Sequence, residues 1–155
     1  MKIGSTLWAW AALLSIGFAV GHLQGQRKSK IPMSHPVFYR TAKVDELSIF
    51  YREAGPKDGP TILLLHGLPS SSRMFESLLS RLSDRYHLVA PDYPGFGHSD
   101  WPDPKHFAYT FDHYAEIMNH FTEALGLKRH TLYMQDYGGP VGFRMVLAHP
   151  NELKL

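Results

Sequence analysis

The sequence contains no cysteine, and this absence excludes two kinds of site at the outset. Without a thiol, the 155 residues can form neither a disulfide nor a thiolate metal centre. An excess of one charge is also missing, because 16 Lys and Arg residues stand against 14 Asp and Glu residues. No stripe of basic residues interleaves with aromatic ones, so nucleic-acid binding is not indicated. We expect no metal ion and no cofactor.

The residues that are present favour a folded domain. Hydrophobic residues make up 44% of the chain and aromatic residues 13%, which is enough for a packed core. The length suits about one domain of ordinary size. A disordered chain is therefore a poor interpretation.

The N-terminal segment differs from the rest of the chain. Ile3–Val20 is an uncharged run of 18 mostly apolar residues, which is near the lower limit for crossing a bilayer. Basic residues follow between positions 27 and 30 and favour a membrane anchor, whereas small residues near the end of the run favour cleavage and export to the periplasm or medium. We predict a signal peptide or membrane anchor over residues 1–23 and a linker over residues 24–36, with both forms of the leader left open.

From Val37 onwards the pattern is that of an α/β protein. Two strand-like runs, 37–44 and 47–53, flank Asp45-Glu46 and predict a β-hairpin. Short apolar runs then alternate with amphipathic stretches, which indicates parallel strands connected by helices. The expected strands span residues 61–65, 86–90 and 130–135, and the expected helices begin near Ser72, Thr110 and Gly138. We predict a mostly parallel sheet with an N-terminal hairpin over residues 37–155.

Several residues mark the ends of these elements. Ser72 and Thr110 are suited to cap the first two helices, and Gly126 is a natural stop for the second. The run 130–135 is expected to be a strand buried on both faces, as in parallel sheets.

Three motifs follow the expected parallel strands, where open α/β sheets bind their ligands. His66-Gly67-Leu68-Pro69 suits a sharp turn that presents a backbone N–H to a pocket, although a purely structural turn needs the same residues. The segment 91–100, PDYPGFGHSD, is interpreted as a structural loop. In the third motif, Asp136 lies where a strand must turn into a helix, and such a turn lifts its central side chain clear of the sheet. A lone Asp at this position would otherwise be interpreted as a helix cap.

Together these motifs resemble a known family. HGLP, APDYPGFGHSD and QDYGGPVGFRMVLAHP are similar to segments of the α/β-hydrolases that use an aspartate nucleophile, the haloalkane dehalogenases and epoxide hydrolases. The resemblance covers about residues 37–150. It implies an α/β-hydrolase fold for that part of the chain.

The resemblance also assigns roles to residues that match the motifs. Asp136 would be the nucleophile that attacks an sp3 carbon and forms an ester with the substrate. The backbone N–H groups of Leu68 and Tyr137 match the oxyanion hole. The residues that would support these motifs are His66, Gly67, Pro69 and Gly138. Two of the matched positions depart from the usual dehalogenase pattern, because Tyr137 stands where Trp is common and Leu68 where Asn or Glu is common.

The resemblance implies an incomplete fold. In the family the cap domain, the catalytic acid and the histidine base follow the third helix, and this sequence ends at Leu155. Its own histidines are poor substitutes, because His149 lies 13 positions beyond Asp136, roughly 20 Å along a helix. We therefore predict a truncated α/β-hydrolase fold without a cap domain, whose base and acid are missing.

Two classes of function remain open. The first is a hydrolase acting on a small apolar epoxide or haloalkane, with epoxide hydrolase ranked ahead of haloalkane dehalogenase. The second is a non-catalytic truncated remnant, or a half-domain that needs a partner chain. The sequence leaves the oligomeric state open.

Overall fold

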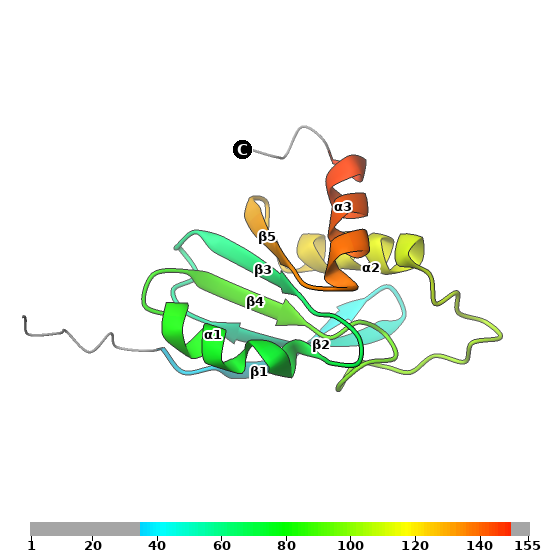
Figure 1. Cartoon of the computed structure of the whole chain (residues 1–155), viewed down its shortest axis with the longest axis horizontal. Coiled ribbons are helices and arrows are strands. Elements are labelled where there is room, and N and C mark those ends of the chain that lie inside the picture. Colours follow the sequence, from blue (N-terminus) through cyan, green and yellow to red (C-terminus); the bar gives the residue numbers. More distant parts are fainter. Residues whose placement is uncertain (1–34, 150–155) are drawn as a thin grey trace, which may run out of the picture. The chain divides into compact units, whose positions relative to one another are not determined.

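The fold is a five-stranded mixed sheet with helices on both faces (Figure 1). The computed structural model describes residues 35–149. In spatial order the strands are β1 (Phe38–Val44), β2 (Leu47–Ala54), β4 (His87–Pro91), β3 (Thr61–Leu65) and β5 (His130–Met134). Strand β3 pairs in parallel with β4 and β5, whereas β2 pairs antiparallel with β1 and β4. The predicted α/β class, hairpin and parallel pairings are confirmed, and the β2–β4 pairing makes the sheet mixed.

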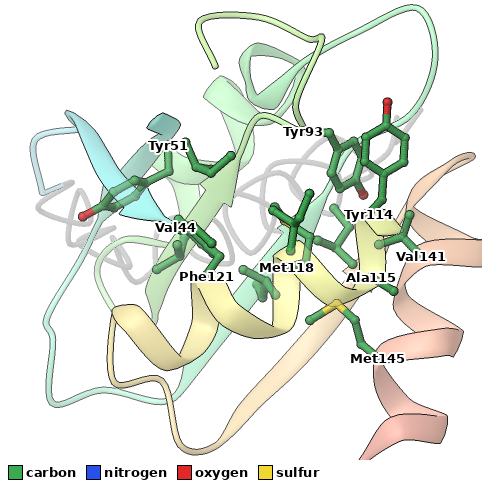
Figure 2. Close-up of a cluster of buried hydrophobic side chains, with 14 of the residues drawn as sticks. Val44, Tyr51, Tyr93, Tyr114, Ala115, Met118, Phe121, Val141 and Met145 are labelled. Carbon is green, nitrogen blue, oxygen red and sulfur yellow. The ribbon is translucent and has the colours of Figure 1, made fainter. Parts of the chain in front are cut away.

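The two faces of the sheet are covered by different helices. A 3-10 turn, η1 (Ser72–Phe75), leads into α1 (Glu76–Leu82) on one face. Helices α2 (Phe111–Ala124) and α3 (Gly138–Ala148) cover the other. Strand β3 serves both cores, because Leu63 and Leu65 point to the α2 and α3 side while Leu64 packs with α1. Figure 2 shows the larger core, in which α2 contributes Tyr114, Ala115, Met118 and Phe121.

The helix ends agree with the sequence in α2 but not in α1. Thr110 caps α2 by accepting the His113 N–H at 3.3 Å, and Gly126 takes a φ of +67° just beyond the helix. The prediction that Ser72 caps a helix is wrong. Ser71 caps the 3-10 turn instead, and Ser72 lies inside that turn with its side chain buried.

Strand β5 is less covered than predicted. It ends at Met134, one residue early, and it is not buried on both faces, since Tyr133 is 49% exposed. Leu132 and Met134 face the α2 and α3 side, whereas η1 and α1 pack over the neighbouring strands and reach this face only where Phe75 meets Tyr133. Among residues 35–149, β5 pairs with β3 alone and forms an edge of the sheet.

The predicted leader lies outside the described residues, as does most of the predicted linker. Within residues 35–149, the structure has no helix long and apolar enough to cross a bilayer.

Candidate active site

The three sequence motifs meet at the carboxyl ends of the parallel strands. They follow β3, β4 and β5, which are parallel, so their carboxyl ends lie side by side. The Leu68 N–H donates a hydrogen bond of 2.8 Å to Asp136 Oδ1, which joins the first motif to the third across 68 positions of sequence. This is the neighbourhood that the sequence predicted for Leu68 and Asp136.

Asp136 occupies the sharp turn between β5 and α3. Its φ is +50°, a left-handed conformation that non-glycine residues seldom adopt. The hydrogen bond from Gln135 N–H to Leu65 O, at 3.1 Å, is the last contact between strands before the turn. The Asp136 side chain is exposed and makes no capping hydrogen bond to α3. The helix-cap interpretation of this residue therefore does not describe the structure.

Two glycines permit the close approach on which the turn depends. A Cβ added at Gly67 would lie 2.4 Å from Asp136 Cβ, and one added at Gly138 would lie 2.3 Å from Leu65 O. Both distances are well inside van der Waals contact. The HGLP turn packs directly against Asp136, and the first turn of α3 packs directly on β3.

His66 lies behind the turn, fully buried. Its Nε2 accepts the Tyr93 N–H at 3.2 Å, so Nδ1 carries the proton and donates to Gly67 O at 3.1 Å. Burial lowers the pKa of His66, although its hydrogen bond to Gly67 and the charge of Asp92 act in the opposite direction. The ring thus connects the segments after β3 and β4.

One backbone N–H group contacts the Asp136 side chain, and a second belongs to the next residue of the chain. Leu68 N–H already contacts Oδ1, and the Leu68–Pro69 peptide bond that follows is cis. Tyr137 is the N-terminal cap residue of α3, where backbone N–H groups have no partner within the helix. The Leu68 N–H is therefore hydrogen-bonded to Asp136, and the assignment of an oxyanion hole to Leu68 and Tyr137 stays a prediction.

A pocket of about 620 Å³ adjoins these groups. Leu68 and Tyr137 form part of its wall, and half of the other lining residues are aromatic: Phe96, Tyr109, Phe111 and Tyr114. Asp112 and Arg144 also line it. Burial raises the pKa of Tyr114 to about 12, with nearby Tyr109 and Tyr137 acting in the same direction, so this phenol is neutral near pH 7. These rings carry no motif in the sequence, because Tyr114 lies on the apolar side of a helix and the loop between residues 100 and 110 has no regular pattern.

Several histidine rings of the described segment contact groups other than Asp136. His87 contacts Glu53 at the opposite end of the sheet, and His113 contacts Ala108 O before α2. His149 follows the last turn of α3. In this segment no cluster of three acidic or histidine side chains is arranged to hold a metal ion.

Comparison with known proteins gives a consistent result. Residues 60–154 match the family described as alpha/beta hydrolase fold. An uncharacterized hydrolase of Saccharomyces cerevisiae is 40% identical over 116 residues, which are 75% of this chain and 39% of that protein. A haloalkane dehalogenase of Psychrobacter cryohalolentis is 35% identical over 119 residues, with 76% of this chain and 39% of the relative covered.

Solved structures show the same likeness. A bacterial membrane phospholipase A, described as a virulence factor, superposes with a TM-score of 0.71 at 32% identity, covering 76% of this chain and 37% of that structure. A haloalkane dehalogenase from Bradyrhizobium elkani gives 0.70 at 30% identity, covering 74% and 38%. The chain therefore spans about two fifths of the length of the relatives it matches.

Proposed function

The chain belongs to the α/β-hydrolase fold family, and we propose that within it Asp136 is the nucleophile of a hydrolase acting on small apolar haloalkanes or epoxides. The observation that supports this most is the placement of Asp136. Its carboxylate is exposed on a left-handed turn, accepts the Leu68 N–H, and lies close to the residues of an aromatic pocket. The turn, Gln135-Asp136-Tyr137, contains no serine or cysteine that could act as the nucleophile instead.

The proposed step is a displacement at an sp3 carbon. One oxygen of Asp136 attacks the carbon, a C–O ester bond forms, and the carbon–halogen bond breaks with its electron pair leaving on the halide. With an epoxide, the ring C–O bond breaks instead, its electron pair goes to the epoxide oxygen, and that oxygen takes up a proton from solvent water. The Leu68 N–H holds Oδ1, which leaves Oδ2 free to face the substrate.

The identity of the leaving group depends on the wall of the pocket. Haloalkane dehalogenases among the relatives favour a halide. The apolar Leu68 side chain, which is 50% exposed, weighs against a halide because it offers the leaving ion no hydrogen bond. The Tyr137 hydroxyl, next to Asp136 in sequence and on the wall of the pocket, is a donor that suits either leaving group.

The second half of the reaction needs a base that activates water. No histidine of residues 35–149 is hydrogen-bonded to Asp136, whose carboxylate is held by the Leu68 backbone. We therefore expect the chain by itself to stop at the ester. The alternative is a chain that does not react at all, which would be a non-catalytic half-domain.

Halide release tests this proposal. The full chain incubated with a primary bromoalkane should release about one bromide per chain and then stop. Asp136→Asn should abolish the release, and Asp58→Asn, a change at an exposed loop carboxylate, should leave it intact. A terminal epoxide, followed as consumed substrate, separates the two substrate types. Continued turnover would show that the chain supplies a base for ester hydrolysis. Absence of both bromide release and epoxide consumption would favour the non-catalytic alternative.

A further inference from the structure

Two fully or nearly fully buried charged side chains lie outside the residues that the proposed reaction uses. Asp92 is fully buried at the end of β4, and Arg52 on β2 is only 6% exposed. Ser72, also fully buried, lies between them: its hydroxyl accepts a hydrogen bond from Arg52, and its backbone N–H donates to Asp92 Oδ1 at 2.6 Å. Burying charge in this way costs free energy unless the charged groups are paired or hydrogen-bonded.

Aromatic rings lie beside Arg52, whose buried Nε has no hydrogen-bond partner, and backbone groups contact Asp92. The Arg52 guanidinium lies 5.2 Å from the centre of the Tyr39 ring and 5.3 Å from that of Phe50. Asp92 Oδ2 accepts the His98 N–H at 2.9 Å. Each carboxylate oxygen therefore receives a backbone N–H, one from each of two loops.

The loops held by Asp92 are those that form the candidate site. Ser72 follows Leu68 by four positions, and Gly67 O accepts the Ser70 N–H at 3.0 Å between them. At the other end of the same turn, Tyr93, the residue after Asp92, donates its N–H to His66. The HGLP turn is thus fixed at both ends by the single segment Asp92-Tyr93.

We propose that Arg52, Ser72 and Asp92 form a positioning network that sets the Leu68 N–H on Asp136. The proposal rests on the function assigned above to Asp136. None of the three residues touches the reacting atoms. Their effect passes through the backbone of residues 66–72, which carries the one N–H that orients the nucleophile.

A second buried carboxylate, on β2 beside Arg52, provides a matched control. Glu53 is 5% exposed, next to Arg52 in sequence, and its oxygens contact Arg40, Lys57 and His87. Its side chain points to the other end of the sheet, toward the start of β4. Glu53→Gln should therefore destabilise the domain without altering the HGLP turn.

The test uses the full chain with two measurements, hydrogen exchange of the segment 66–72 and the rate at which Asp136 is alkylated. Ser72→Ala removes the link to Arg52 and keeps the backbone bond to Asp92, while Asp92→Asn replaces one acceptor oxygen by a donor. We expect Asp92→Asn to slow alkylation and speed local exchange by about tenfold, and Ser72→Ala to do so by less. Glu53→Gln should change neither.

The outcomes separate this proposal from the one on which it rests. If Glu53→Gln slows alkylation as much as Asp92→Asn at equal loss of stability, the network is merely structural and the proposal is wrong. If Asp92→Asn does not fold, Ser72→Ala decides, and unchanged exchange and alkylation in that variant would overturn the proposal. If the unaltered chain is not alkylated, the proposed function fails, while hydrogen exchange still decides whether the network fixes the turn.

Discussion

Position 138 requires glycine because the backbone of α3 lies in close contact with that of β3 there. An added Cβ would lie 2.3 Å from Leu65 O, and a backbone oxygen in a central strand cannot move aside. We expect Gly138→Ala to lower the free energy of unfolding by about 1–3 kcal/mol. The adjacent Gly139 has no heavy atom within 4 Å of such a Cβ. Gly139→Ala should therefore change stability by less than about 1 kcal/mol, and in the stabilising direction. Denaturant unfolding of both variants gives the comparison, and equal losses would show that α3 does not press on β3 in this way.

The buried ring of His66 makes stability depend on pH. Burial lowers its pKa, so the folded state disfavours the protonated ring while the unfolded chain takes up a proton near pH 6.5. Stability should be unaffected above that value and fall as the pH drops below it, until the folded ring also becomes protonated. Unfolding measured from pH 8 to 5 tests this. His66→Gln should be less stable at pH 7 and should lose less stability on acidification, whereas an unchanged acid slope would assign the effect to other groups.

His120 acts in the opposite direction. Its hydrogen bond to Asp45 raises its pKa, and that pair is well exposed, so its protonation adds little stability at low pH. The loss of stability at low pH caused by His66 should therefore exceed the small gain from His120.

Among the elements, the two edge strands of the sheet differ in their protection. Strand β1 carries Arg40 and Lys43, and charged side chains discourage pairing with other chains. Strand β5, HTLYM, has no Lys, Arg, Asp or Glu and exposes Tyr133. In the described segment its outer backbone groups have no partner strand.

We expect this edge to cause association. Residues 31–155 expressed alone should be insoluble, molten or self-associated, as judged by size-exclusion chromatography and near-UV circular dichroism. Thr131→Lys, on the exposed side of β5, should reduce the association. Thr41→Lys, at an exposed position of β1, is the matched control and should have little effect. A sharp monomer peak for the unaltered segment would show that β5 is closed in a way that the strand order does not reveal.

The elements themselves were largely predictable from the sequence. The run TILLL could only be a buried strand, and Thr110 with Gly126 marked both ends of α2. The prediction was wrong where tertiary contacts decide. Ser71 and Ser72 are equally good caps by composition, but the contact with Arg52 draws Ser72 into the core. Likewise, the apolar residues of β5 do not reveal that α1 leaves one face of this strand uncovered.

At the level of the whole molecule, the site was only partly predictable. Asp136, Leu68 and Tyr137 were identified because their motifs resemble a family, and the structure places them together. The Arg52–Ser72–Asp92 network was missed, because its members are far apart in sequence and Asp92 looked like any acidic loop residue. The aromatic pocket was missed for a similar reason, since its walls come from four separate segments.

The central claim is that Asp136, and no other side chain, forms a covalent bond with substrate. Incubating the full chain with a primary bromoalkane, followed by peptide mapping in a mass spectrometer, tests it most directly. We predict a single added alkyl group per chain, located on Asp136 and absent from Asp136→Asn. An adduct spread over lysine and histidine side chains, unchanged in Asp136→Asn, would contradict the account.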